Sequence, residues 1–296
     1  MRTTRGGITL AEESPRRGRS RWVARGVIVA LVAVLALGAW VGGRQLLGDF
    51  VGPRCQATAA DTTVDFDPEQ MSNAATITAL ALRRGLPARA ATIALATAIQ
   101  ESKLRNIRYG DRDSVGLFQQ RPSQGWGTVE QILDPEYSTN KFYDALVKVD
   151  GWQDASITEV AQEVQRSAYP EAYADHEMEG RVLASTLAGH TERSLGCRLD
   201  DPQGEADVDM IGRLLENEYR LDASAGERAG TLTVEVPNDQ IGWSVAQWSV
   251  AKAVDTGITG VTYGDRTWTR SSDSSAYEWQ RADPPAPDGQ VVLHLN

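Results

Sequence analysis

The segment "AIQESKLRNIRYGDRDSVGLFQQRP", residues 98–122, joins the end of an apolar helix to a loop of glycine, glutamine and charged residues. In the helix before it, positions 93, 94, 97, 98 and 101 share one face and are Ile, Ala, Thr, Ala and Glu. Glu101 therefore continues an apolar, tightly packed stripe. We expect a carboxyl held there to lose hydration of its charged form, which raises its pKa and suits a general acid.

The loop after Glu101 predicts one wall of a cleft. Gly110 and Gly116 permit a chain reversal, and Phe118 and Gln119 offer an aromatic face and an amide that suit a sugar ring. The competing interpretation is a hydrated glutamate at a helix end, followed by an ordinary turn. That interpretation leaves the order "SVGLFQ" (114–119) unexplained.

The two motifs "QESKLRN" (100–106) and "SVGLFQQRP" (114–122) resemble the lysozyme-like superfamily, in the style of soluble lytic transglycosylases and goose-type lysozymes. In those families a Glu-Ser pair ends a helix, a Gly-Leu-Met-Gln loop follows, and the glutamate is the catalytic acid. Phe118 stands where methionine is usual. The resemblance covers about residues 67–190. It implies that Glu101 is catalytic and that Ser114, Gly116, Phe118 and Gln119 bind substrate.

The same resemblance implies further site residues. Asp111 sits where goose-type enzymes carry a second carboxylate, although a hydrated turn and a weak cation site are the alternatives. The segment "VQRSAYPEAYA" (164–174) falls where transglycosylases carry a Tyr-Asn motif. Tyr-Asn is absent from it, so Tyr169 and Tyr173 are the candidates. The implied substrate is the glycan strand of peptidoglycan, cleaved by hydrolysis or by transglycosylation.

The N-terminal part predicts a membrane anchor. Residues 26–43 are uncharged, mostly apolar and just long enough to span a bilayer. Arginines crowd residues 1–25, so we expect this segment in the cytoplasm and the C-terminal part outside a single-pass cell-membrane protein. A signal peptide cleaved near residues 36–38 is the alternative. The remainder of the chain is acidic and lacks a basic footprint for nucleic acid.

Cys55 and Cys197 are the two cysteines of the chain. In an exported protein we expect them to form one disulfide, whereas an inverted topology would leave two free thiols. Neither cysteine has the spacing of a metal ligand, and the three histidines are scattered. The sequence therefore predicts no metal and no cofactor.

The rest of the chain predicts a linker (44–66), a mainly α lysozyme-like domain (67–199) and a small α+β domain (200–296). In the last of these, "TLTVEV" alternates as a strand, residues 240–255 are helical, and a hairpin turns at Gly264-Asp265. Its four tryptophans are expected either to pack in the core or to form a surface that binds a partner protein of the cell envelope. A non-catalytic peptidoglycan-binding or scaffolding protein is the alternative to an enzyme, because fold does not determine function.

Overall fold

Helices α2 and α3 form the centre of the first half of the chain, in a computed structural model that describes residues 52–165 and 170–296. Helix α2 (Pro68–Arg83) begins at Asp67, whose side chain accepts a hydrogen bond from the Gln70 backbone in a capping box. All side chains from Met71 to Ala81 are buried, so α2 is enclosed by its neighbours. The other helices of this half of the chain are α3 (Ala88–Ser102), α4 (Val129–Ile132), α5 (Pro135–Leu146), α6 (Ile157–Gln165) and α7 (Glu177–Leu187), with short 3-10 helices η1 (Pro122–Gln124) and η2 (Pro170–His176).

Several predictions concern residues that the structure does not describe. The predicted cytoplasmic segment (1–25), the predicted anchor (26–43), the start of the linker (44–51) and Tyr169 lie outside the described residues. Within residues 52–165 and 170–296, no helix is both long enough and apolar enough to cross a bilayer.

The second half of the predicted linker is a β-hairpin, which corrects the sequence-based assignment. Strands β1 (Arg54–Ala59) and β2 (Thr62–Phe66) pair with each other, and β1 also pairs with β3 (Leu195–Arg198) in a three-stranded antiparallel sheet. Alternate side chains of β1 are buried, beginning with Cys55. Cys55 faces Cys197 in the register, and the two form the predicted disulfide.

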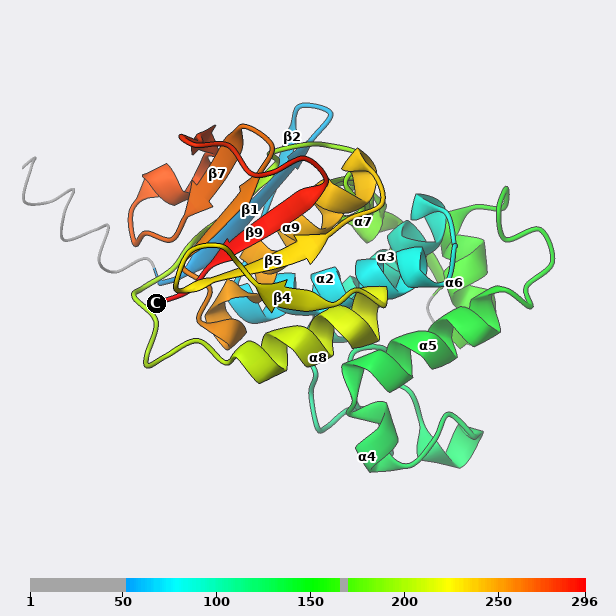
Figure 1. The fold of residues 1–296 in the computed structure, drawn as a ribbon. Helices are drawn as coiled ribbons and strands as arrows, with labels where there is room; N and C mark the ends of the chain where they lie inside the picture. Colours follow the sequence, from blue (N-terminus) through cyan, green and yellow to red (C-terminus); the bar gives the residue numbers. More distant parts are fainter. Residues whose placement is uncertain (1–51, 166–169) are drawn as a thin grey trace, which may run out of the picture. The chain divides into compact units, whose positions relative to one another are not determined.

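A six-stranded antiparallel sheet, in the order β4-β5-β9-β6-β7-β8, dominates the C-terminal part (Figure 1). The predicted strand, helix and hairpin are confirmed there. The elements are α8 (Val208–Tyr219), β4 (Ala223–Ala225), β5 (Thr231–Glu235), α9 (Asp239–Thr256), β6 (Gly260–Tyr263), β7 (Arg266–Thr269), the 3-10 helix η3 (Ser274–Tyr277), β8 (Gln280–Arg281) and β9 (Gln290–His294).

Helix α9 lies between this sheet and the N-terminal helices. It contacts β6 and β9 on one side and α2 on the other (Figure 1). The boundary predicted between residues 199 and 200 therefore falls inside one compact unit, residues 53–296. The C-terminal tryptophans belong to the core, because none is more than 8% exposed; they are Trp243, Trp248, Trp268 and Trp279.

Candidate active site

Glu101 lies in the last turn of α3, on the face that packs into the protein. The preceding residues on that face, from Ile93 to Ala98, are fully buried, while Glu101 itself is half-buried. The helix ends directly afterwards because Lys103 and Leu104 adopt left-handed backbone conformations, with φ of 55° and 57°. The carboxyl group thus sits at the point where an apolar helix face meets a loop.

The Glu101 carboxyl has two side-chain hydrogen-bond partners. The Tyr173 hydroxyl donates to Glu101 Oε1 at 2.6 Å, and the Gln165 side chain also hydrogen-bonds to this carboxyl. Burial raises the pKa of Glu101 above its ordinary value, and the hydrogen bonds from Tyr173 and Gln165 oppose this rise because donors stabilise the charged form. Proximity to the negative end of the helix dipole also disfavours the carboxylate.

Glu101 belongs to none of the ion pairs that the described residues form. Arg105, which lies one helical turn beyond it in the sequence, instead pairs with Asp67 and Glu69. A fixed ion pair would have kept Glu101 charged and unable to donate a proton. Among the described residues no ion pair fixes the charged form of Glu101, so its carboxyl is suited to proton transfer.

Ser102 ties the loop to the end of the helix. Its hydroxyl bonds to the Leu117 carbonyl at 2.7 Å, and the Gly116 amide donates to the Ile107 carbonyl at 2.7 Å. Gly116 has φ of 79°, and a Cβ atom there would lie 2.7 Å from the Ile132 carbonyl oxygen. The backbone conformation and the close contact both require glycine, so Gly116 shapes the loop.

Phe118 does not present its ring to a sugar, which corrects the prediction made from the sequence. The side chain is fully buried and stacks on Phe142, with 4.6 Å between the ring centroids. Burial in the core stabilises an aromatic ring at this position more than exposure to solvent does. Its backbone remains part of the site, because the Phe118 carbonyl accepts a hydrogen bond of 2.5 Å from Gln165 Nε2.

The polar residues predicted to bind substrate mostly brace the loop. The Gln119 amide donates to the carbonyls of Gly116 and Tyr109, at 3.2 and 3.4 Å. Ser114 is buried, and its backbone N–H bonds to the Asp111 carbonyl. Tyr173 is the predicted substrate residue that the structure brings into contact with Glu101.

The two aspartates of the turn behave differently. The Asp111 side chain is 88% exposed and lies 3.9 Å from the Arg112 guanidinium. Asp113 accepts hydrogen bonds from the backbone and hydroxyl of Ser123 and from Arg121, and these donors hold its pKa well below the usual range. No hydrogen bond or ion pair between described residues joins either aspartate to Glu101. Within residues 52–165 and 170–296, no group of three His, Cys, Asp or Glu side chains could hold a metal ion.

Gln165 is the site residue that the sequence analysis missed. It is the last residue of α6 and follows the buried side chains of Ala161 and Val164. Its position, four residues after Ala161, continues the apolar face of α6 as Glu101 continues that of α3. A polar residue that ends an apolar stripe is the signal that could have identified it.

Comparison with known proteins assigns this chain to no group. No protein-family model matches it, and no curated protein sequence does.

Proposed function

We propose that this protein cleaves the glycan strand of peptidoglycan, with Glu101 as the general acid of a lysozyme-like domain. The observation that carries the proposal is the half-buried Glu101 carboxyl with its raised pKa, which is oriented by Tyr173 and is outside any described ion pair. A raised pKa increases the share of the protonated carboxyl at a given pH, and the protonated form can donate its proton to the oxygen of a glycosidic bond.

The surroundings of Glu101 favour a mechanism with one carboxyl group. Two-carboxylate glycosidases hold their acidic groups about 5–9.5 Å apart across the scissile bond. Here Asp113 is engaged by Ser123 and Arg121, and Asp111 extends into solvent. Glu101 protonates the leaving oxygen, and the resulting carboxylate then takes the proton of a hydroxyl on the same sugar as that hydroxyl closes an anhydro ring. This is the chemistry of a lytic transglycosylase.

The proposal includes a location outside the cell membrane, with residues 26–43 as the anchor. The Cys55–Cys197 disulfide supports it, because disulfides persist in oxidising compartments and are rare in the cytosol. Protease added to intact protoplasts should then digest residues 55–296. Full protection of these residues would contradict both the location and the substrate.

A non-catalytic protein that binds peptidoglycan is the second candidate. The observation that favours it is the loop itself, because the Phe118 ring is in the core and the Gln119 amide is engaged with backbone carbonyls. Such a protein would keep the fold, bind the glycan strand and release no product.

Mass spectrometry of the products from purified peptidoglycan tests the proposal. Anhydro-ended fragments are expected from the wild-type protein, and reducing ends would mark a hydrolase instead. Glu101→Gln should lower the rate by about 10²–10⁴-fold, whereas Glu163→Gln, an exposed glutamate on α6, should leave it unchanged. If the wild type binds peptidoglycan without releasing fragments, the second candidate replaces the first.

Two further substitutions test the roles assigned around Glu101. Asp111→Asn should have little effect in a one-carboxyl mechanism, and a loss as large as that of Glu101→Gln would establish a two-carboxylate hydrolase. Tyr173→Phe removes a donor that lowers the pKa of Glu101. The alkaline limb of the pH–rate profile should therefore move to higher pH, and an unmoved limb would exclude Tyr173 as a positioning residue.

A further inference from the structure

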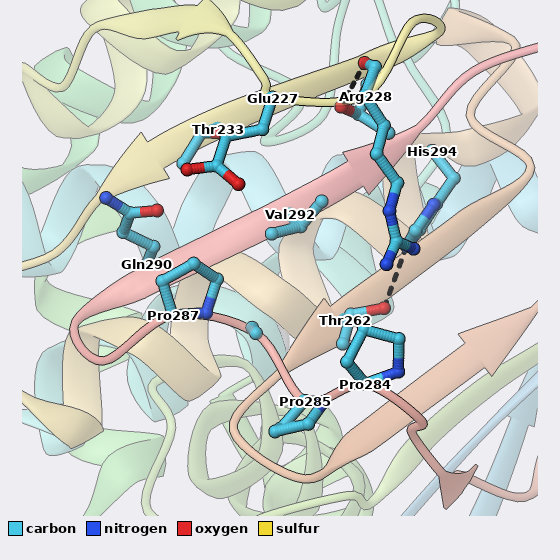
Figure 2. Close-up of a pocket in the computed structure, with 12 residues that line it drawn as sticks. Glu227, Arg228, Thr233, Thr262, Pro284, Pro285, Pro287, Gln290, Val292 and His294 are labelled. Atoms are coloured by element: carbon cyan, nitrogen blue, oxygen red, sulfur yellow. Dashed lines mark hydrogen bonds between the residues drawn. The ribbon is translucent and has the colours of Figure 1, made fainter.

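The outer face of the six-stranded sheet carries an open groove of about 280 Å³ (Figure 2). Helix α9 packs against the other face of this sheet, so on β5 and β9 the floor of the groove is formed by the side chains that alternate with the buried ones. The floor includes Thr233 of β5, Thr262 of β6 and Val292 of β9. The β4–β5 loop and the segment Pro284–Pro287 form its walls.

One end of the groove is suited to an anion. His294 Nε2 lies 2.8 Å from the Thr262 hydroxyl, and Figure 2 shows the Arg228 side chain extending across the groove towards this pair. Burial lowers the pKa of His294, and the positive charge of Arg228 lowers it further, which shows that the two groups are close. The Arg228 guanidinium forms no ion pair with another described residue, so its donors are available to a carboxylate.

The other end carries the opposite charge. The Glu227 carboxylate projects beside Gln290 and Thr233, away from the guanidinium of the adjacent Arg228 (Figure 2). Glu227 also forms no ion pair with a described residue. Between the charged ends, Val292 and the proline wall supply apolar surface. The groove is therefore positive at one end, apolar in the middle and negative at the other end.

The charges at the two ends limit the kind of occupant. The groove of about 280 Å³ has room for several water molecules, and so for a small organic ligand. A simple anion would be repelled by the Glu227 carboxylate, and a simple cation would be repelled by the Arg228 guanidinium. A dipeptide with both ends free has a suitable size and carries one charge of each sign.

We infer that this groove binds a small zwitterionic peptide, with its carboxylate at Arg228 and its ammonium group at Glu227 and Gln290. Small aliphatic side chains of the peptide contact Val292 and the proline wall. The site shares no residue with the surroundings of Glu101, so the inference does not depend on glycan cleavage.

Isothermal titration calorimetry of the full-length protein with alanyl-alanine, as the L,L and the D,D form, tests the inference. At least one form should bind, and acetylation of its amino end or amidation of its carboxyl end should weaken binding about tenfold or more. Arg228→Gln should weaken binding of the free dipeptide about tenfold without affecting the amidated one. Glu227→Gln should weaken binding of the free dipeptide about tenfold without affecting binding of the acetylated one. Arg281→Gln, on exposed β8 outside the groove, is the matched control.

Three outcomes would overturn the inference. They are the absence of heat with either dipeptide at millimolar concentration, acetate binding as tightly as the dipeptide, and unchanged affinity in both groove variants. The two variants change exposed side chains of a loop, so both should fold like the wild type. A thermal unfolding transition at the wild-type temperature checks this.

Discussion

Replacing Lys252 by methionine should destabilise the protein more than any surface substitution, because it leaves a buried carboxylate without its counter-charge. The Lys252 ammonium lies 3.3 Å from Glu218 Oε1, and the two side chains are only 7% and 3% exposed. The pair joins α9 to α8, and Thr76 of α2 bonds to both members. It therefore holds the N-terminal helices to the C-terminal part.

The magnitude follows from what remains around Glu218. After Lys252→Met, its carboxylate keeps two neutral donors, the Thr76 hydroxyl at 2.9 Å and Trp248 Nε1 at 2.6 Å. Removing one partner of a buried ion pair costs about 3–5 kcal/mol. Since a folded domain is stable by about 5–15 kcal/mol, this loss is a large share of the total.

Urea unfolding, monitored by tryptophan fluorescence, measures the loss of stability. The double variant Lys252→Met/Glu218→Gln tests the cause of that loss. The glutamine keeps an acceptor for Trp248 and removes the unpaired charge, so the double variant should regain most of the lost stability. Arg105→Met is the matched control at an exposed pair, where the Arg105 side chain is 40% exposed and about 0–1 kcal/mol is expected. A loss below 1 kcal/mol for Lys252→Met, or a double variant no more stable than the single one, would show that the unpaired Glu218 carboxylate is not what destabilises the protein.

Three other predictions concern the site and its frame. The raised folded-state pKa of Glu101 means that its contribution to stability is complete below about pH 4.5 and is lost as pH rises through the raised value. Glu101→Gln should therefore be increasingly more stable than wild type as pH rises from 4.5, and a pH-independent difference in unfolding free energy would contradict this. Replacing Cys55 and Cys197 by alanine opens a loop of 142 residues and should cost roughly 5 kcal/mol in the chain-entropy model; an unchanged urea midpoint would refute it. Gly116→Ala should cost about 1–2 kcal/mol from its left-handed backbone alone and should reduce glycan cleavage, and wild-type values in both assays would exclude a role for this turn.

Features that depend on local spacing could be predicted from the sequence. The positions of Glu101 and its apolar stripe follow from the helical repeat, and the alternation of "TLTVEV" predicts strand β5. The hairpin at Gly264-Asp265 follows from turn chemistry. The cysteine pairing was predictable because the chain has only two cysteines.

Which distant segments meet could not be predicted in this way, because it depends on packing across the whole chain. Strand β1 is short and polar on alternate residues, and it forms because β3, more than 130 residues later, supplies its second partner. From the sequence, Phe118 could face a cleft or the core. In the structure it lies in the core, because its ring stacks on that of Phe142. The contact between Gln165 and Glu101 joins the ends of two helices, which no local repeat encodes. Periodicity reports which face of an element is buried, but the partner on that face is determined by packing across the whole chain.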